Sequence, residues 1–399
     1  MIDGEHLTCD VLIVGAGPSG GHLARLLASH GVDVLLVDQL PDLRRAAFSS
    51  AALPIEAVAS FGLPAEVVAS RWRSWQLIGP AQASRHWSSA VPLGVVLDFG
   101  ALRLWLAEQC RCWGGRVELG LRALGCQEVS GGLLTHLRRS DGCPVVVRSS
   151  WVVDASGQGR ALLGDPSELV VGRGVEWLLQ VDPSPAQRWA DQLTFLLGSD
   201  WVPQGYGWVF PMQCGRLKLG VCRLDQPLCA SSSSRQRPLG PDLQTLLCRL
   251  DLDGARVLDR HGGLIRSRID RREPHGRGRL IGLGDAVSTA NLLGGEGIRH
   301  ALASAGLLAP LLLQERDPDR LRRRYQRQLS RHFGWRWPLS GRLARRTWLA
   351  LRDRRADHRL ERLLAGLETC EAADLSALLF DYCFERYGLR ALPYLLGWR

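Results

Sequence analysis

The chain has 399 residues and a formal net charge of +10, with 46% hydrophobic and 23% charged residues. This balance is typical of a folded globular protein rather than a disordered one, and the length suits about two domains. The first ten residues carry three acidic side chains and no lysine or arginine, which argues against a secretory signal peptide. The uncharged stretch 301–314 is shorter than the ~20 apolar residues that cross a bilayer, so we expect a cytoplasmic protein without a transmembrane helix.

The positive charge is concentrated in one late segment. Residues Arg316–Arg362 hold sixteen arginines and five acidic residues, a net charge of +11, so the rest of the chain is close to neutral. A protein built throughout around a polyanion would spread its positive charge, and no nucleic-acid-binding motif is present, so nucleic acid is not expected as a partner. Trp335, Trp337 and Trp348 are interspersed with these arginines, which favours peripheral contact with an anionic membrane surface; a solvated helix face is the alternative.

The N-terminal part has the pattern of one strand–helix–strand unit. The apolar run Asp10–Val14 predicts a buried strand, the sequence GAGPSG follows at residues 15–20, and the next stretch places leucines on one helix side. Gly31 is expected to end this helix, and Val32–Val37 predicts a second strand with Asp38 at its end.

This unit is typical of dinucleotide binding. A strand that leads directly into a helix leaves backbone N–H groups facing outward, and the helix dipole favours a pyrophosphate there. The first glycine would make the tight turn, the second would let phosphates approach, and the third would let helix and strand pack closely. Asp38, 23 residues after Gly15, lies near the offset at which an acid binds the adenosine ribose hydroxyls. The alternative is a packing turn without a ligand. The residues of the turn are Gly15, Gly17, Pro18, Ser19 and Gly20.

The middle of the chain predicts one helix and a series of strands. Ala101–Trp113 has apolar residues at helical spacing, and two short β-rich runs, Val145–Val147 and Trp151–Val153, lead to Asp154 and Gly157. Further strands are expected at Val175–Val181, Leu193–Leu197, Tyr206–Phe210 and Leu217–Leu224. In the third of these, Tyr206, Trp208 and Phe210 alternate and therefore share one face.

A second glycine-rich turn occurs late in the chain. The predicted strand Arg279–Leu283 is followed by Gly284 and Asp285, then by a glycine cluster and a helix that runs to about Gln314. An aspartate at a strand end can accept hydrogen bonds from sugar-like hydroxyls, and the helix start after Gly297 offers positive dipole to an anion. A strained turn without a ligand is the alternative. From residue 319 onwards the chain is expected to be helical.

The order of these motifs resembles the flavoprotein superfamily that includes the aromatic hydroxylases, and within it the geranylgeranyl reductase family. Four stretches carry the resemblance: GAGPSGGHLARLLASHGVDVLLVD near the start, VVDASGQGR at 152–160, QGYGWVFP at 204–211 and GDAVSTANLLGGEGIRHALASAG at 284–306. The YxWxFP pattern within the third stretch is the most telling, because the hydroxylases do not generally carry it.

The resemblance implies FAD as the cofactor and an α/β fold. A Rossmann-type FAD-binding domain would be interleaved with a mixed β-sheet substrate domain and followed by a helical C-terminal extension. The expected FAD-binding domain is discontinuous and comprises residues 1–72, 97–165 and 276–315. The substrate domain would comprise residues 73–96 and 166–275, and the arginine-rich helical region residues 316–399.

Matching positions imply which residues would contact FAD. The glycine turn and Asp38 would hold the ADP half, Asp285 the ribityl chain, and the late glycine cluster would lie beside the pyrimidine edge of the flavin. A helix start at that edge would stabilise the negative charge of a reduced flavin. Tyr206, Trp208 and Phe210 would line an apolar cavity beside the ring, with an ordinary aromatic core as the alternative. The remaining implied cofactor residues are Asp154, Gly157, Gly284, Gly294, Gly295, Gly297 and Ile298.

The function that the resemblance implies is reduction of C=C bonds in a hydrophobic isoprenoid or isoprenoid-linked substrate by hydride transfer from reduced flavin. No second GxGxxG unit is present for a nicotinamide. NAD(P)H would therefore bind transiently at the same cavity, or a ferredoxin-like protein would supply the electrons. The alternatives are a flavin-dependent monooxygenase or halogenase, a non-redox flavoenzyme of the lycopene cyclase type, and a flavin-binding carrier without turnover.

The sequence also departs from the family pattern. Residues 48–54 replace a Cys-Gly-rich loop, so a mechanism that rests on a thiol there is in doubt. Phe99 stands where an arginine commonly contacts the cofactor, and Leu292-Leu293-Gly294 replaces the more usual Pro-Leu-Thr. The cysteines and histidines show no spacing typical of a metal site, and none is predicted.

Overall fold

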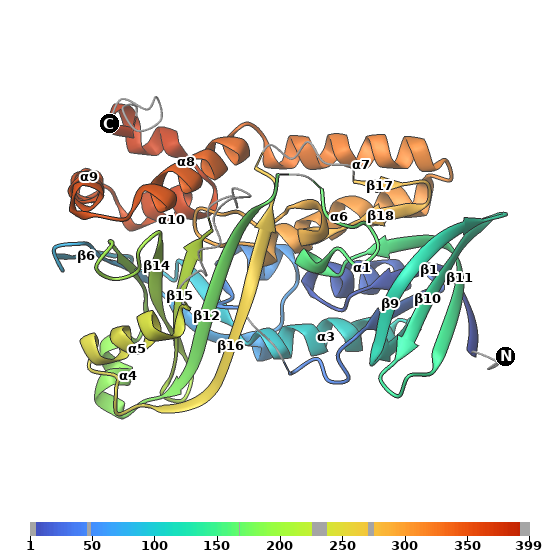
Figure 1. Cartoon of the computed structure of the whole chain (residues 1–399), viewed down its shortest axis with the longest axis horizontal. Coiled ribbons are helices and arrows are strands. Elements are labelled where there is room, and N and C mark those ends of the chain that lie inside the picture. Colours follow the sequence, from blue (N-terminus) through green and yellow to red (C-terminus); the bar gives the residue numbers. More distant parts are fainter. Residues whose placement is uncertain (1–4, 46–48, 167, 226–237, 270–274, 392–399) are drawn as a thin grey trace.

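The computed structural model describes residues 5–45, 49–166, 168–225, 238–269 and 275–391. Phe48 and the outer ends of the expected terminal domains lie outside these residues. The chain forms two large sheets, a small third sheet, and a layer of helices that covers both large sheets from one side (Figure 1). The predicted α/β fold with a helical C-terminal extension is confirmed.

The first large sheet has eight strands around a parallel centre. Its main path has the order β17-β18-β11-β1-β2-β8, and β9 and β10 extend it as an antiparallel hairpin beside β11. The strands of this sheet are β1 (Glu5–Val14), β2 (Val34–Asp38), β8 (Arg116–Leu119), β9 (Leu121–Val129), β10 (Gly132–Arg139), β11 (Pro144–Asp154), β17 (Gly276–Arg277) and β18 (Leu280–Gly282).

Three long helices pack together beside this sheet, and a fourth packs on them. Helix α1 (Pro18–Ala28) contacts both α3 (Phe99–Cys112) and α6 (Ile298–Gln314), and α7 (Pro318–Phe333) packs on α6. Leu23 and Leu27 of α1 are fully buried, as the helical spacing of the leucines predicts. The helix ends before Gly31, whose φ of +74° is the left-handed conformation that glycine adopts readily.

The second large sheet has seven strands in the order β16-β12-β15-β14-β13-β5-β6. It is antiparallel except for the pair formed by β13 and β5. Its strands are β5 (Ser74–Ile78), β6 (Ser84–Ser88), β12 (Val170–Gln180), β13 (Gln192–Leu197), β14 (Gly205–Met212), β15 (Arg216–Leu224) and β16 (Arg256–Ser267). Helices α4 (Pro183–Trp189) and α5 (Gly240–Arg249) cover one face, where the leucines of α5 pack on β14 and β15.

The remaining elements connect and cover these sheets. Strands β3 (Ala52–Pro54), β7 (Gly94–Leu97) and β4 (Val68–Trp72) form the small third sheet, with α2 (Glu56–Ser60) beside it. After α7 the chain continues through α8 (Arg336–Ala350), α9 (Arg354–Ala365) and α10 (Ala372–Phe380). These last three helices share a hydrophobic core with the seven-stranded sheet, on the face opposite α4 and α5.

The structure differs from the expected elements mainly in strand length. The two short runs at 145–147 and 151–153 are parts of one strand, β11, because the polar residues between them keep the alternating pattern and pair with β1 and β10. The first strand likewise begins at Glu5 rather than Asp10, since its polar N-terminal half still pairs with β11.

Candidate functional site

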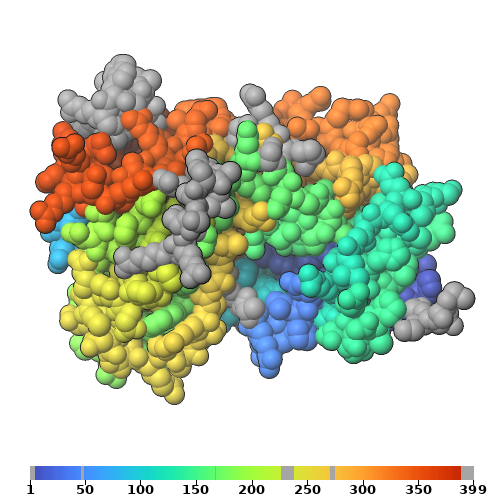
Figure 2. Space-filling model, viewed as in Figure 1, coloured from blue at the N-terminus to red at the C-terminus, as the bar shows by residue number. Residues whose placement is uncertain are grey.

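A cavity of about 730 Å³ lies between the two large sheets. We call it the large cavity. Loops that follow the parallel strands β1, β2 and β11 border it on one side, and the seven-stranded sheet borders it on the other. In Figure 2 the surface is hollowed between the teal residues of the β9–β10 hairpin and the gold residues of β16, and the cavity lining includes Leu121–Leu124 and Gly263–Ile265 from these strands. The position at the carboxyl ends of parallel strands is where open α/β sheets bind ligands.

Each glycine of the first turn has the geometry expected for its role. Gly15 has a φ of +110°, and a Cβ there would lie 2.3 Å from the carbonyl oxygen of Ala155. A Cβ on Gly20 would lie 1.9 Å from the carbonyl oxygen of Gly15, so helix and strand pack too closely for any side chain. Gly17, by contrast, has open space around its Cβ position and lines the large cavity. It is also the N-cap of α1 and makes no side-chain cap, which leaves the first helical N–H groups available to an anion.

Asp38 ends β2 at the edge of the same cavity. Its carboxylate accepts hydrogen bonds from the backbone N–H groups of Ala16, at 2.7 Å, and Leu40, at 2.9 Å. The guanidinium of Arg103 lies 3.5 Å from the same carboxylate and also donates to the carbonyl oxygen of Ala16. These contacts hold the acid at the end of the glycine turn, where it lines the large cavity.

Arg103 is a residue of the large cavity that the sequence motifs did not indicate. It projects from α3 one turn after Phe99, it is buried, and it lines the large cavity with Phe99. The guanidinium carbon lies 6.0 Å from the centre of the Phe99 ring. The signal was present in the sequence, because Phe99 and Arg103 are four residues apart and therefore share a helix face. Arg103 thus lies one helical turn after Phe99, the position at which the resemblance implies an arginine.

The late glycine-rich turn borders the large cavity from the other side. Asp285, in a short 3₁₀ helix, accepts a hydrogen bond from the Thr289 hydroxyl at 2.9 Å, and burial raises the pKa of its carboxyl. Gly297 is the N-cap of α6 without a side-chain cap, so this helix start also presents N–H groups to the cavity. The predicted residues of this turn that line the cavity are Asp285, Gly294, Gly295, Gly297 and Ile298.

Three predicted cofactor residues do not line the large cavity. The Asp154 carboxylate, which is fully buried, is occupied by hydrogen bonds from Ser156 and from the backbone N–H groups of Leu162 and Leu163. It therefore holds the chain after β11 in place, and the following Gly157 reaches the cavity instead. Gly20 and Gly284 serve close packing, since a Cβ on Gly284 would lie 2.5 Å from the Ser19 hydroxyl.

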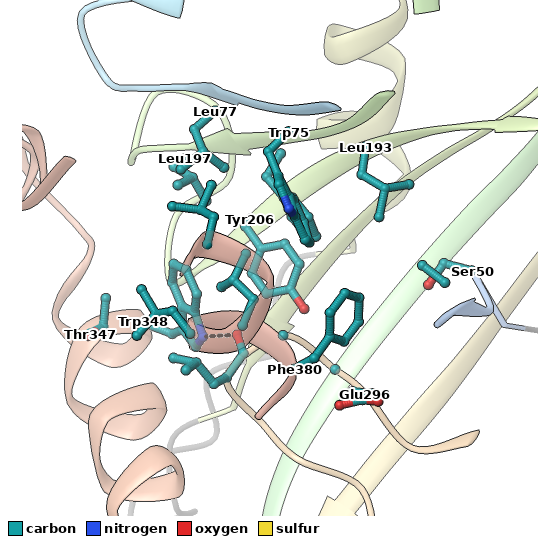
Figure 3. Close-up of a pocket in the computed structure, with 18 of the residues that line it drawn as sticks. Ser50, Trp75, Leu77, Leu193, Leu197, Tyr206, Glu296, Thr347, Trp348 and Phe380 are labelled. Atoms are coloured by element: carbon teal, nitrogen blue, oxygen red, sulfur yellow. Dashed lines mark hydrogen bonds between the residues drawn. The ribbon is translucent and has the colours of Figure 1, made fainter. Parts of the chain in front are cut away.

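A second, smaller cavity of about 220 Å³ adjoins the first. We call it the apolar cavity, because leucine and aromatic side chains form most of its wall. One side is the seven-stranded sheet, and the other is the inner face of α8, α9 and α10 (Figure 3). The two cavities share part of their lining, the residues Ser49, Ser50, Phe195, Tyr206, Phe210, Gly294, Gly295, Gly297, Ile298 and Trp348.

The aromatic residues of β14 lie at this shared wall. Tyr206 and Phe210 line both cavities, and Trp208 between them lines the large one. The Tyr206 ring packs against Trp348 of α8 with centroids 4.9 Å apart, and its hydroxyl is 3.0 Å from the position of a Cβ on Gly295 (Figure 3). Burial raises the pKa of the Tyr206 hydroxyl well above its usual value, so it stays protonated.

Glu296 is the carboxylate that faces the apolar cavity among the described residues. It accepts hydrogen bonds from Arg299 at 2.6 and 3.1 Å and from the Tyr382 hydroxyl at 3.1 Å, and His300 lies 3.1 Å away. Burial opposes ionisation, but His300 and Arg299 outweigh it and lower the pKa of Glu296 to about 2. Because Arg299 also pairs with Asp381, this network ties the start of α6 to the segment after α10.

The arginine-rich segment differs from the expectation in where its tryptophans lie. Trp337 and Trp348 are buried, the first against α6 and α7 and the second at the shared wall, so they are unable to rest in a membrane interface. Only Trp335 of the three is exposed, at 65%. The apolar residues of these helices instead complete the protein core, and most of the arginines lie on the outer faces.

The described part of the chain holds no group of three or more histidine, cysteine or acidic side chains placed to bind a metal ion. Within the same residues, none of the helices has both the length and the apolar character needed to cross a bilayer.

Comparisons with known proteins agree with this geometry. A family model described as an FAD binding domain matches residues 8–51, the segment that holds the glycine turn and Asp38. The digeranylgeranylglycerophospholipid reductase of Haloferax volcanii is 27% identical over 316 residues, which cover 75% of this chain and 74% of the relative. The menaquinone reductase of Mycobacterium tuberculosis is 28% identical over 347 residues, 79% of this chain and 78% of the relative.

Among solved structures, a geranylgeranyl bacteriochlorophyll reductase-like protein from Thermoplasma acidophilum has the same fold. The two superpose with a TM-score of 0.81 at 20% identity, over 97% of this chain and 98% of the other. The resemblance that the sequence motifs indicate is therefore confirmed by sequence relatives and by fold. Together with the FAD-binding match, these findings identify the chain as an FAD-dependent oxidoreductase that resembles the geranylgeranyl reductases.

Proposed function

We propose that this protein reduces C=C bonds in a hydrophobic isoprenoid or isoprenoid-linked substrate. The observation that carries the proposal is the wall shared by the two cavities. It places an apolar cavity, lined by leucines and aromatic rings, directly beside a larger cavity with a glycine turn typical of dinucleotide binding. The names of the two sequence relatives, reductases of a geranylgeranyl lipid and of a quinone, support the same substrate class.

The large cavity is proposed to hold FAD. Gly17 and the start of α1 would receive the pyrophosphate, Asp38 would bind the ribose, and Asp285 would bind the ribityl hydroxyls. The open space at Gly17 and the uncapped start of α1 fit such a group. Bound FAD, once reduced, would supply the hydride. The eight-stranded sheet would then belong to the FAD-binding domain and the seven-stranded sheet to the substrate domain, with the boundaries expected from the sequence.

The chain's own residues would orient the substrate and keep water away. Tyr206, Phe210 and Trp348 form an aromatic wall that an apolar chain can lie against, and the leucines of α9 and α10 close the far side. The Tyr206 hydroxyl stays protonated and points toward Gly295. This hydroxyl is therefore a protonated group beside the late glycine cluster, suited to orient a polar atom of the substrate or the cofactor.

Two further parts of the proposal concern partners. Electrons would come from NAD(P)H that binds transiently at the large cavity or from a ferredoxin-like protein. An anionic membrane would attract the outer face of α7, where Arg323, Arg327 and Arg331 are exposed at intervals of one turn, close to the exposed ring of Trp335. Contact there would bring the protein to the phase in which an isoprenoid substrate dissolves.

The test is the product formed from a geranylgeranyl lipid by the purified, dithionite-reduced protein, first without and then with dioxygen. Reduction adds two hydrogens to the product, and we expect this mass change under anaerobic conditions. A product that gains an oxygen only in air would show a monooxygenase, and an isomer of unchanged mass would show a cyclase. Either result, or the absence of any product with a protein that retains FAD, would contradict the proposed reduction.

A further inference from the structure

Four residues lie in one row across the seven-stranded sheet. Trp208 of β14 is opposite Gly220 of β15, and Gly220 is in turn opposite Glu176 of β12. Glu176 is opposite His261 of β16, the strand at the edge of the sheet. Residues opposite one another point to the same face, so the indole, the carboxylate and the imidazole share a face. This face borders the large cavity, which Trp208 lines.

Gly220 leaves the space through which Trp208 reaches across the sheet. A Cβ on Gly220 would lie 2.1 Å from Cζ2 and 2.3 Å from Cε2 of the indole, so the ring lies directly over the backbone of β15. Across this gap the indole Nε1 donates a hydrogen bond of 2.9 Å to Oε2 of Glu176, two strands away. A side chain at position 220 would push the ring off the sheet.

The Glu176 carboxylate is buried on this face of the sheet, and neighbouring groups compensate its burial. Its side chain is fully buried, and a buried carboxylate is costly unless other groups compensate it. His261 Nε2 lies 3.4 Å from Oε1, and the other ring nitrogen of His261 lies 3.0 Å from Asp259. On its cavity side the carboxylate therefore accepts a hydrogen bond from the indole N–H, and on the side of the sheet edge it contacts the imidazole.

We propose that Glu176 is a positioning residue that fixes the Trp208 ring and thereby the shape of the cavity wall against which substrate and cofactor lie. A buried indole N–H normally has a hydrogen-bond acceptor, and in the observed orientation of Trp208 that acceptor is the Glu176 carboxylate. In that orientation the Trp208 ring lies beside Tyr206 and Phe210, with ring centroids 6.0 and 6.4 Å away, and lines the large cavity. The role in catalysis rests on the proposed function, because it requires the substrate to reach this wall.

The first test measures the ring itself and needs no substrate. In purified FAD-loaded protein labelled with ¹⁵N-tryptophan, the Trp208 indole resonance is identified by its loss in Trp208→Phe. We expect slow hydrogen exchange in the wild type and in Glu176→Gln, which keeps an acceptor oxygen, but rapid exchange and a moved resonance in Glu176→Leu. An unchanged resonance in Glu176→Leu would overturn the proposal. If that variant does not fold, Gly220→Ala displaces the ring with Glu176 intact and must move the same resonance.

The second test separates this proposal from the proposed function. With a geranylgeranyl lipid as substrate, Glu176→Leu should raise KM about tenfold with FAD still bound at full stoichiometry, because the unpaired indole N–H no longer fixes the wall. Glu176→Gln should stay close to the wild type. Wild-type kinetics in Glu176→Leu would overturn the positioning role, as would an equal defect in Glu176→Gln. A wild type that does not act on the lipid would contradict only the proposed function, and the resonance would still decide the position of the ring.

Discussion

The ammonium group of Lys218 donates a hydrogen bond of 2.8 Å to the carbonyl oxygen of Ser49. Two further carbonyl oxygens, those of Ser50 and Leu97, lie 3.2 Å from the same nitrogen. Lys218 is the only lysine of the chain, and it is buried on the sheet face that carries Trp208. Its three N–H donors thus hold the loop at Ser49 and Ser50 against the place where the two cavities meet.

Replacing this lysine should loosen that loop. In Lys218→Met, three carbonyl oxygens lose the donor that bonds them, and we expect the free energy of unfolding to fall by about 2 kcal/mol or more. Denaturant unfolding measures the change. Arg216→Met is the matched control on the same strand, because among the described residues Arg216 bonds one nearby carbonyl, that of Gln213 at the surface. Equal stability of Lys218→Met and the wild type would show that the loop needs no such anchor.

Gly17→Val should abolish FAD binding without unfolding the protein. The Cβ position of Gly17 is open toward the large cavity, so the added side chain would occupy the space needed for phosphates rather than clash with the fold. Flavin absorbance per protein measures the loss. Gly240→Val is the control, since Gly240 also has open space but lies on α5, away from the cavity. A yellow Gly17→Val protein would contradict the proposed pyrophosphate site.

Arg103→Met should weaken FAD binding at least tenfold. The variant removes the positive charge beside Asp38 and the donor to Ala16, so the end of the glycine turn loses a support. Titration of the apoprotein with FAD gives the affinity. Arg111→Met, in the last turn of the same helix but exposed and paired with Glu108, should bind FAD as the wild type does. Similar affinities in the two variants would exclude Arg103 from the site.

The contribution of Glu296 to the stability of the fold should decrease as the pH falls. The pKa of Glu296 is lowered from 4.5 to about 2 in the folded protein, so its ionised form stabilises the fold above about 4.5 and this stabilisation is lost as pH falls toward 2. Thermal unfolding of the wild type and Glu296→Gln should therefore differ most near neutral pH and converge in acid. A difference that is constant from pH 7 to pH 3 would mean that Arg299 and His300 do not stabilise the charge.

Binding to anionic vesicles should depend on the outer face of α7. Arg323, Arg327 and Arg331 should each contribute roughly 1 kcal/mol to the attraction to an anionic membrane. Added salt should weaken this attraction because it shortens the Debye length. Co-sedimentation with phosphatidylserine vesicles, and with neutral vesicles as the control, measures it. Charge reversal of the three arginines should abolish binding. Binding that persists in the reversed variant or in high salt would show that these arginines form only a solvated face.

The local parts of the site could be predicted from the sequence, and the parts made by tertiary packing could not. Gly15, Gly17 and Asp38 belong to one contiguous unit, so their spacing alone predicts that they lie together, and all three line the large cavity. Whether a tryptophan faces lipid or the core depends on what packs on its helix, and the interfacial prediction for Trp337 and Trp348 was wrong for that reason. Likewise, Glu176 and Trp208 meet only because Gly220 separates them in the strand register.

The packing of the C-terminal helices has a consequence for how cooperatively the protein unfolds. Leu321, Tyr325 and Leu329 of α7 belong to the core that contains β1 and α1, whereas Leu360 and Leu364 of α9 belong to the core of the seven-stranded sheet. One continuous stretch of chain therefore contributes side chains to the core beside the eight-stranded sheet and to the core of the seven-stranded sheet. Neither of these two halves of the molecule has a complete core without it. We expect a single unfolding transition, which a cofactor bound in one half would shift upward for the whole molecule. The segment that carries the surplus charge on its outside is thus what makes the two halves one folding unit.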